Sequence, residues 1–316
     1  MHKHRIIDCH SHIGLDNTWE KEGILLEYIN NAKSQGITES LLMPVPMPIM
    51  SIGNYSITPV MLGSDGENNF IVQRVKNSNG EHALTISQNP YQYANLMLYQ
   101  QISTYNNKGI NLHFVPLIHP LFDTIEYLKQ LILFFNPIAF KIHGYSSIIS
   151  PYEIDIEFWE LIHYYNIPLI IHTDCDISNT VQTLDTLYRN ENSPFNWIEL
   201  LEKYSIKAYL THGVRLSEIS CRIINESPNL VVGLGPDGLL TTCRGRMYSN
   251  APYLETLFSK VNTEKICFDI DYPWNVVSYD NKEFDWDSIN RITALGLTDS
   301  ELEKVLYENA KSFFSL

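Results

Sequence analysis

The stretch that decides the fold lies near the start of the 316-residue chain and reads Arg5-Ile6-Ile7-Asp8-Cys9-His10-Ser11-His12. Its first part, Arg5 to Cys9, is a short apolar run that predicts a buried β-strand ending at His10. Alternate residues of a strand point to the same side, so we expect Asp8, His10 and His12 to face the interior of the fold together. Polar side chains at the carboxyl end of a buried strand are typical of the mouth of an α/β barrel.

Seven further apolar runs predict strands at Ser40 to Val45, Leu112 to Ile118, Ile138 to Ile142, Ile167 to Ile171, Lys207 to Thr211, Leu230 to Leu234 and Lys265 to Ile270. Helical patterns lie at Thr18–Gln35, Ile125–Phe135, Glu153–Tyr164, Pro194–Tyr204, Leu216–Glu226, Tyr253–Lys260 and Asp299–Phe313. Continuous apolar strands that alternate with helices predict right-handed βαβ units and a parallel sheet. Eight such strands favour an α/β fold of the closed (β/α)8 TIM barrel type, as one domain over residues 1–316. No glycine-rich dinucleotide fingerprint follows the first strand, which argues against an open doubly wound sheet.

One segment interrupts this repeat, an insertion at about 47–89 after the second strand. Within it, Phe70–Lys76 and His82–Ser87 flank Asn-Ser-Asn-Gly and predict a β-hairpin with its turn at Asn79-Gly80. Insertions that follow a barrel strand project over the mouth, so a lid or a substrate wall is one hypothesis. An edge decoration or an oligomer contact is the other.

The composition narrows the class of protein. Hydrophobic residues make up 44% and charged residues 18% of the chain, which fits a globular protein. The net charge of -14 argues against a nucleic-acid partner, because phosphate contacts need clustered cations. No segment has the length and apolarity of a membrane span, and Met1 leads into the first strand without a secretory signal. We therefore expect neither nucleic acid nor membrane as a partner, and a cytoplasmic location.

The cysteines are five in number and scattered, with no CxxC pair that would indicate a zinc knuckle or a redox motif. Cys9 and Cys267 lie inside apolar strand runs, where reduced and buried thiols are expected. Metal chemistry, where present, must therefore come from other side chains.

Histidines and one carboxylate recur at the predicted strand ends. Lys141-Ile142-His143 ends the fourth strand, His172 the fifth, His212 the sixth and Asp271 the eighth. A single buried histidine is ordinarily a hydrogen-bonded core residue, and one His-x-His pair is a weak signal. Ionisable groups at five of eight strand ends are a different case, because burying them together requires a compensating centre. Imidazole nitrogen and carboxylate oxygen are ligands that Zn²⁺ accepts.

The ordered set of His10-x-His12, Lys141, His172, His212 and Asp271 resembles the amidohydrolase superfamily of metal-dependent barrel enzymes. Within it, the chain is most similar to the amidohydrolase-related (amidohydrolase 2) branch, which contains hydrolases, lactonases and non-oxidative decarboxylases. The runs that carry the resemblance span nearly the whole chain: Ile7-Asp8-Cys9-His10-Ser11-His12, Phe140-Lys141-Ile142-His143, Pro168-Leu169-Ile170-Ile171-His172-Thr173, Leu210-Thr211-His212-Gly213, Asp269-Ile270-Asp271-Tyr272-Pro273-Trp274 and Tyr307-Glu308-Asn309-Ala310-Lys311.

The resemblance implies a divalent metal, with Zn²⁺ expected and one or two ions. His10 and His12 would bind the more buried ion, helped by Asp271. His172 and His212 would bind a second ion, or one of them would complete a single-metal site while the other contacts the substrate.

The resemblance leaves Lys141 with three readings. In some superfamily members a lysine on this strand is carboxylated and bridges two metals, and in this branch it often contacts the substrate. From the residues alone, Lys141 is also a counter-charge for Asp271 or Asp8. His143 is a ligand, a substrate contact or a group that supports the ligands.

The resemblance implies a hydrolase that directs a metal-activated water at an amide, lactone or ester-like bond, with Asp271 as general acid–base. A non-oxidative decarboxylase of a small organic acid uses the same ligands and is the alternative, and a barrel that keeps its metal only for structure is a third. Arg215, Arg244 and Arg246 follow the sixth and seventh strands and suggest capture of a carboxylate on a small-molecule substrate. Solvated ion pairs are the other interpretation of these arginines. A homo-oligomer is left open.

Overall fold

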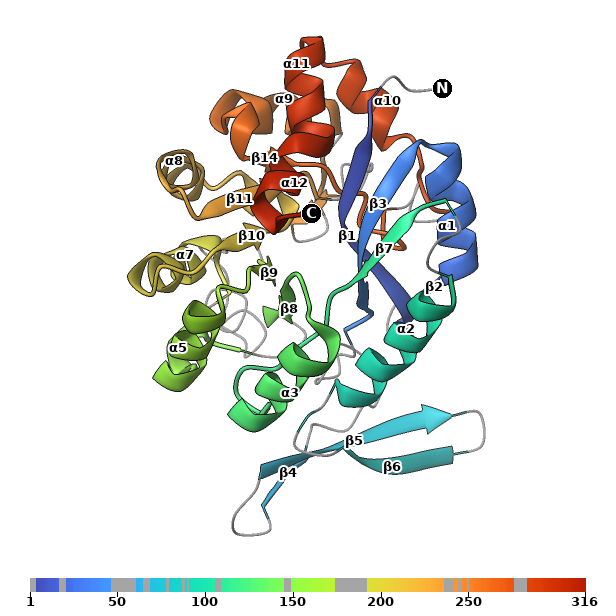
Figure 1. Ribbon diagram of the computed structural model, residues 1–316, viewed down its shortest axis with the longest axis vertical. Helices are drawn as coiled ribbons and strands as arrows, with labels where there is room; N and C mark the ends of the chain where they lie inside the picture. The colour runs from blue at the N-terminus through green and yellow to red at the C-terminus, as the bar shows by residue number, and fades with distance from the viewer. Residues whose placement is uncertain are drawn as a thin grey trace.

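The computed structural model describes residues 4–16, 21–46, 61–64, 69–77, 80–86, 89, 91–105, 109–144, 149–173, 192–235, 241–243, 246–248, 250–275 and 283–316. Parallel strands lie in the middle of the molecule and helices surround them (Figure 1). The protein therefore has an α/β fold, as the alternating pattern of the sequence predicts.

The first sheet has the strand order β2-β1-β3-β7. Strands β1 (Ile6–Asp16), β3 (Ile37–Pro44) and β7 (Asn111–Phe114) run parallel, and β2 (Lys21–Gly23) returns antiparallel along the end of β1. The pairing of β1 with β3 shifts between Asp8 and Ser11, where three steps along β1 match two along β3. This β-bulge changes which side chains of β1 face inward.

The second sheet has the order β14-β11-β10-β9-β8, and all its strands are parallel. Their bounds are β8 Phe140–His143, β9 Leu169–His172, β10 Ala208–Leu210, β11 Leu230–Gly233 and β14 Ile266–Cys267. Backbone hydrogen bonds join the two sheets at both margins. The amide of Lys141 donates to the carbonyl of Pro116 at 2.9 Å, and the amide of Cys9 donates to the carbonyl of Phe268 at 3.0 Å.

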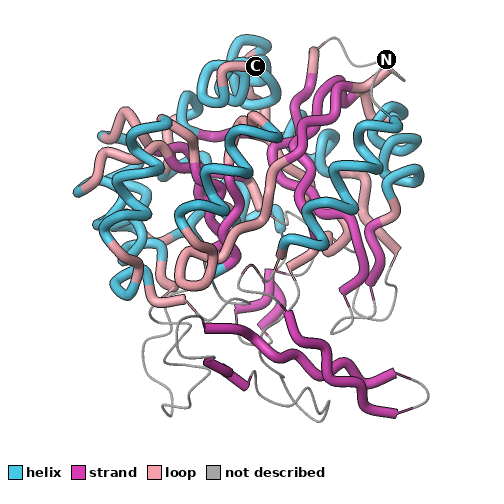
Figure 2. The backbone as a smooth tube through the Cα atoms, turned by 60° about the horizontal axis from the view of Figure 1, so that its bottom comes forward, coloured by secondary structure: helices cyan, strands magenta, loops and turns pink. Residues whose placement is uncertain are grey.

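The helices pack on the outside of the strands (Figure 2). The larger core cluster lies between helices and strands and contains the fully buried Trp159 and Trp197. A smaller cluster collects strand side chains such as Ile7 and Cys9 and includes Tyr307 and Phe314 near the carboxyl terminus. The helices are α1 Leu25–Ser34, α2 Gln92–Tyr105, α3 Ile125–Phe135, α5 Ile156–Tyr165, α7 Pro194–Lys203, α8 Glu218–Glu226, α9 Asn250–Lys260, α10 Ser288–Thr293, α11 Asp299–Glu303 and α12 Asn309–Phe314.

Each predicted strand overlaps an observed one, and most predicted helices agree to within a few residues. The helix predicted from Thr18 is wrong at its start, because Lys21–Gly23 forms β2 and α1 begins only at Leu25. A Cβ at Gly23 would collide with the carbonyl of His12, so this glycine permits the close pairing. The pattern also left out α2 and α10, because the buried side of α2 includes the polar Asn95 and α10 is only six residues long.

The insertion forms a separate antiparallel sheet of β4 (Met61–Ser64), β5 (Asn69–Asn77) and β6 (Gly80–Ile86). Gly80 pairs with Asn77 in the ladder and belongs to β6, and residue 79 of the turn predicted at Asn79-Gly80 lies outside the described residues. In Figure 1 this sheet lies beyond α2, outside the ring of helices. Its role as a lid stays a prediction.

Among the described helices, none is long and apolar enough to cross a membrane. Cys9, Cys221 and Cys267 are buried free thiols.

Candidate metal centre and active site

His10 and His12 lie in the middle of β1, which continues to Asp16 and does not end at His10 as the apolar run predicts, and both side chains are buried. Their Nε2 atoms are 2.9 Å apart. The Nδ1 of His12 lies 3.0 Å from the carbonyl oxygen of Pro44, which can only accept a hydrogen bond. Nδ1 of His12 therefore carries the proton, and its Nε2 presents a lone pair toward His10. Two imidazoles that converge in this way fit a shared cation.

Asp8 does not join this pair, and the prediction that it faces the same way as His10 and His12 is wrong. Its carboxylate accepts hydrogen bonds from Ser11 Oγ at 2.6 Å and from Tyr28 Oη of α1 at 2.5 Å. The bulge adds a residue between Asp8 and His12, so the period of two fails here. Burial raises the pKa of Asp8, against the lowering effect of these hydrogen bonds. Asp8 therefore faces α1 and stabilises β1 from the side away from the two histidines.

Asp271 approaches His10 from the other side. Its Oδ1 lies 3.4 Å from His10 Nδ1, and both side chains are almost fully buried. The backbone amide of Asp271 donates to the carbonyl of His10 at 2.9 Å, and the amide of His12 donates to the carbonyl of Tyr272 at 2.7 Å. These bonds hold the segment after β14 against the middle of β1, which positions the carboxylate.

Lys141 is fully buried, and its Nζ lies 2.8 Å from His10 Nε2. Burial lowers the pKa of Lys141 to about 7, while the charges of Asp271 and Asp269 act to raise it. Burial also lowers the pKa values of His10 and His12 well below their usual range, and Lys141 adds to this effect. Both imidazoles are therefore neutral at neutral pH, which is the form that binds metal.

Three further histidines of the predicted site, His143, His172 and His212, form a second group. His212 Nε2 lies 2.8 Å from His172 Nδ1, and the ring of His143 stacks on that of His172 with centroids 3.9 Å apart. The ring centroids of His212 and His10 are 5.6 Å apart. His172 is partly exposed, whereas His10 and His12 are buried.

Backbone strain marks two of these positions. His212 has a φ of 58° and Asp271 a φ of 51°, in the left-handed region that side chains other than glycine rarely adopt. Such positions cost roughly 1–3 kcal/mol each and concentrate at functional sites. One nitrogen each of His10 and His212 and one carboxylate oxygen of Asp271 lie within 4.8 Å of one another. This donor set fits a divalent cation.

Two supporting contacts have no clear signal in the sequence. Asp269 accepts hydrogen bonds from Tyr209 Oη and, at 2.8 Å, from the amide of Gly235. Gly235 has a φ of 76°, and a methyl group there would lie 2.5 Å from His212 Cα. Only the period-two spacing of Asp269 and Asp271 hints at this support. Trp274 packs edge-on against His12, with centroids 4.7 Å apart.

The arginines proposed to capture a carboxylate are not placed by the structure. Arg244 and the side chains of Arg215 and Arg246 lie outside the described residues. Of the predicted site residues, the structure brings together His10, His12, Lys141, His143, His172, His212 and Asp271.

Comparison with known proteins agrees with this arrangement. A family model described as amidohydrolase matches residues 123–316, more than half of the chain. A crystal structure of amidohydrolase II is similar with a TM-score of 0.60 and 13% identity, covering 98% of this chain and 100% of the other. IDCase from Metarhizium anisopliae, in apo form, has a TM-score of 0.58 and 10% identity, with 98% and 97% covered.

Beta-aspartyl dipeptidase from Fervidobacterium islandicum, in complex with a beta-Asp-Leu dipeptide, has a TM-score of 0.53 and 13% identity, with 98% of this chain and 74% of the other covered. No curated protein matches the sequence. At these low identities the likeness to solved structures establishes the fold alone.

Proposed function

Because this chain belongs to the amidohydrolase family, we propose that it is a metal-dependent hydrolase acting on an amide, lactone or ester-like bond of a small molecule. The observation that carries the proposal is the convergence of three buried groups. The Nε2 atoms of His10 and His12 face each other at 2.9 Å, and Asp271 lies 3.4 Å behind His10. Burying three polar groups together costs free energy, and packing of the core alone does not require it.

The proposal includes a closed barrel formed by the whole chain as one domain. Eight strands are mutually parallel within their two sheets, and backbone hydrogen bonds link the sheets at Lys141 and at Cys9. The smaller core cluster supports closure, because it draws side chains from strands of both sheets into one group. The histidines then surround one end of the barrel.

In the proposed site, His10, His12 and Asp271 hold one divalent cation, expected to be Zn²⁺, and His212 completes the set. In a second version of the site, Lys141 is carboxylated and is itself a metal ligand. The burial that lowers its pKa to about 7 leaves much of it as free amine at neutral pH, the form that reacts with carbon dioxide to give a carbamate. A carboxylated Lys141 would bridge two ions, with His172 and His212 on the second.

The cation supplies Lewis-acid polarisation of a substrate oxygen and increases the acidity of a water molecule. Asp271 accepts the proton of the attacking water and delivers it to the leaving group, a general acid–base role. His172, which is partly exposed, and His143, which stacks on it, contact the substrate. Capture of a substrate carboxylate by Arg215, Arg244 and Arg246 remains part of the proposal, on the sequence alone.

The proposal is tested by metal analysis together with a substrate panel. The purified protein is expected to contain one or two equivalents of divalent metal and to hydrolyse members of a panel of lactones, N-acyl amino acids and simple esters. Release of carbon dioxide from small organic acids, without hydrolysis, would establish the decarboxylase instead. Stoichiometric metal with neither activity would point to a structural metal. Intact-protein mass and a high-resolution crystal structure would show whether Lys141 is carboxylated.

A further inference from the structure

The buried carboxylate of Asp8 forms hydrogen bonds with both segments that hold the pair of His10 and Asp271. Its Oδ1 accepts from the backbone amide of His10 at 3.2 Å and from the backbone amide of Ile270, also at 3.2 Å. His10 is a proposed metal ligand, and Ile270 directly precedes Asp271, whose carboxylate faces His10. A single oxygen atom therefore joins β1 to the segment after β14. We call this arrangement of Asp8 Oδ1 with the two amides the Asp8 clamp.

The two amides lie where the strands are irregular, which explains why a side chain serves as their acceptor. His10 falls at the bulge between Asp8 and Ser11 and has no paired position in the ladder of β1 with β3. Ile270 lies beyond Cys267, the last residue of β14. Buried backbone N–H groups need an acceptor, and Asp8 provides one for both.

The second oxygen of Asp8 is held by two hydroxyl groups. Ser11 Oγ donates to Oδ2 at 2.6 Å, and Tyr28 Oη of α1 donates to it at 2.5 Å. A tyrosine has one hydroxyl proton, so the contact of 2.7 Å between Tyr28 Oη and Ser40 Oγ is a bond that Ser40 donates. The position of the carboxylate is therefore fixed by groups other than the proposed ligands.

We propose that Asp8 is a positioning residue, which sets the separation of His10 and Asp271 and thereby the affinity of the site for a divalent cation. His10 Nδ1 and Asp271 Oδ1 are 3.4 Å apart. Movement of either segment away from the other would break a bond of the Asp8 clamp, so the clamp resists such movement. Loss of a group that supports metal ligands in this way typically lowers metal affinity by roughly 10- to 100-fold. The inference rests on the proposed metal-dependent function, but it concerns cation binding and not turnover.

Two substitutions separate the position of Oδ1 from the charge of Asp8. Asp8→Leu removes the acceptor for both amides at nearly the same side-chain size. Asp8→Asn removes the charge but keeps one oxygen for the two amides, because the hydroxyls of Ser11 and Tyr28 can rotate to accept from its NH2 group. A positioning role predicts that asparagine preserves the site, whereas a purely electrostatic role predicts that both variants fail alike.

Asp123→Leu is the matched control. Asp123 is a buried aspartate between β7 and α3, and its Oδ2 accepts the backbone amide of His119 at 2.7 Å. The change also removes the acceptor of a buried amide, but neither residue belongs to the segments that carry the proposed ligands. Tyr28→Phe is a second control, since it removes a donor to Oδ2 and leaves both bonds of the Asp8 clamp in place.

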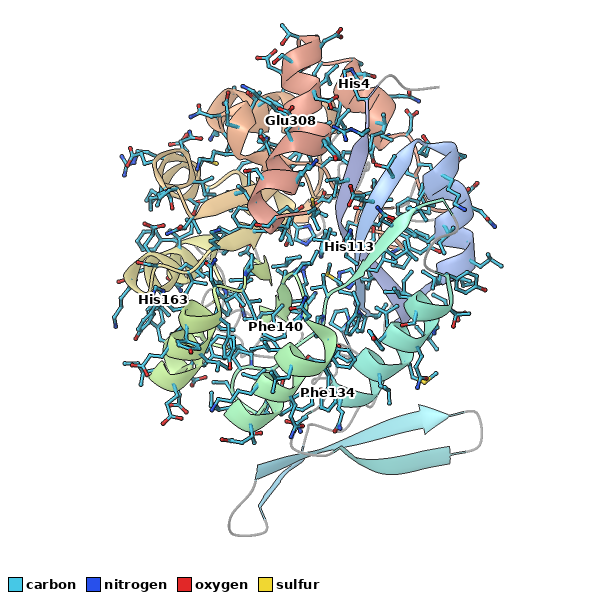
Figure 3. All side chains as sticks on the ribbon, viewed as in Figure 1. His4, His113, Phe134, Phe140, His163 and Glu308 are labelled. Carbon is cyan, nitrogen blue, oxygen red and sulfur yellow. The ribbon has the colours of Figure 1, made fainter. Side chains whose placement is uncertain are left out.

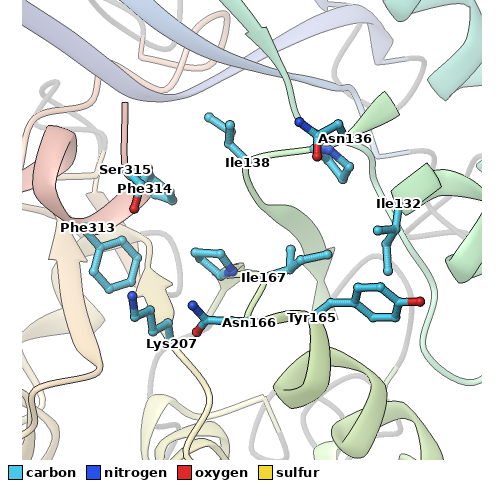
Figure 4. Close-up of a pocket in the computed structure, with 12 residues that line it drawn as sticks. Ile132, Asn136, Ile138, Tyr165, Asn166, Ile167, Lys207, Phe313, Phe314 and Ser315 are labelled. Atoms are coloured by element: carbon cyan, nitrogen blue, oxygen red, sulfur yellow. The ribbon is translucent and has the colours of Figure 1, made fainter. Parts of the chain in front are cut away.

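Few other places in the described chain offer ligands for a divalent cation. The described residues contain one group of three such ligands within 4.8 Å of one another, His10, His212 and Asp271. A pocket of about 250 Å³ near the amino ends of β8 and β9 is lined by Ile138, Ile167 and others, but by no histidine, cysteine or carboxylate (Figure 4). The histidines that Figure 3 labels lie apart on different segments, namely His4, His113 and His163. Tight binding of a cation therefore reports the site that the Asp8 clamp supports.

The test measures cobalt(II) affinity by isothermal titration calorimetry, on the full chain freed of metal and carrying no histidine tag. The absorption spectrum of the bound cobalt reports the geometry of its ligands, and urea unfolding reports the stability of each variant separately. Asp8→Leu is expected to bind cobalt roughly 10- to 100-fold more weakly than wild type and to change the spectrum. Asp8→Asn is expected to stay within about threefold of wild type, because its oxygen still accepts from both amides. Both controls are expected to match wild type.

Asp8→Glu covers the case in which the leucine variant does not fold. It keeps the charge but moves the oxygens by one methylene group, so it should weaken cobalt binding although the charge is unchanged. Cobalt affinity like wild type in Asp8→Leu or Asp8→Glu would overturn the proposal, and so would an asparagine variant as weak as the leucine variant. Wild-type protein that binds no cobalt would refute the metal-dependent function and this inference with it. The expected order of cobalt affinities without any hydrolysis would support the inference and refute only the proposed reaction.

Discussion

The two histidine pairs of the site differ in how the chain holds them. His10 and His12 stand two residues apart on one strand and are buried, and the Pro44 carbonyl and the Asp271 carboxylate orient them. His172 and His212 come from β9 and from the turn after β10 and contact each other at 2.8 Å. The first pair is oriented by groups on β3 and on the segment after β14, whereas in the second pair His212 has a φ of 58° and its carbonyl accepts a hydrogen bond from Tyr253 Oη at 2.8 Å.

This difference indicates a division of labour. The pair that is neutral, buried and held by hydrogen bonds suits permanent binding of a cation. In the second pair, His172 is partly exposed and suits contact with a ligand that enters and leaves, whereas His212 is buried and has a nitrogen near those of His10 and the carboxylate of Asp271. Four experiments test the contrast, in order of decreasing expected effect.

Replacement of one histidine of each pair by alanine gives the largest contrast. Loss of a residue that hydrogen-bonds to a metal ligand typically lowers metal affinity by roughly 10- to 100-fold. His12→Ala removes a proposed ligand itself, so it is expected to lower metal affinity by more than this and to abolish turnover. His172→Ala is expected to retain at least one metal per chain. Elemental analysis after dialysis against a weak chelator measures both variants. Equal loss of metal in the two would end the distinction between the pairs.

Removal of the proton acceptor separates binding from chemistry. Asp271→Asn keeps an oxygen that can approach the cation but removes the base, so turnover should fall by about 10²- to 10⁴-fold while metal remains largely bound. Steady-state kinetics and metal content are measured on the same preparation. Turnover close to wild type would refute the role assigned to Asp271.

A glycine substitution beside His212 disturbs the second pair most directly. Gly235→Ala puts a methyl group 2.5 Å from His212 Cα in a backbone with a φ of 76°. Gly296→Ala is the matched control, because its φ is 75° and nothing lies within 4 Å of the added methyl. Both lose about 1 kcal/mol of stability from the backbone, and Gly235→Ala loses roughly 1–3 kcal/mol more. Urea unfolding reports the stability, and a fall in turnover for Gly235→Ala alone reports the displaced His212.

Lys141 gives the most selective effect, on the pH dependence of stability in metal-free protein. Burial lowers its pKa from 10.5 to about 7, so the unfolded chain binds more protons than the folded one between these pH values. Stability contributed by this site therefore rises as pH increases from about 7 to 10.5, and it is constant below the folded pKa. Lys141→Met should remove that rise. Chemical denaturation at several pH values measures it, and identical slopes in both proteins would show that Lys141 is not desolvated.

Much of the candidate site follows from local patterns. The apolar runs predict where strands end, and parallel strands bring their carboxyl ends to one side, so His10, His172, His212 and Asp271 are predicted to converge. The family resemblance drawn from these motifs is confirmed by the match over residues 123–316. These features depend on hydrophobic periodicity and on chain direction, both of which can be read from a single sequence.

Other features arise only when strands pair. Whether Asp8 faces the histidines depends on a bulge in the pairing of β1 with β3, and no pattern within Arg5 to His12 records it. The distance of 2.8 Å between Lys141 and His10 depends on how two separate sheets meet. The same holds for Gly235, whose contact with His212 joins two strand ends.

The sequence by itself determined the class of fold and the residue types at the strand ends, because burial favours a regular spacing of apolar side chains. The tertiary structure decided which of those polar groups meet and which ring nitrogen of His12 carries the proton. It also decided that Asp8 faces away from the histidines of β1. Those properties come from contacts between segments distant along the chain. Hydrogen bonds and bulges set such contacts to within an ångström, on a scale that periodicity does not encode.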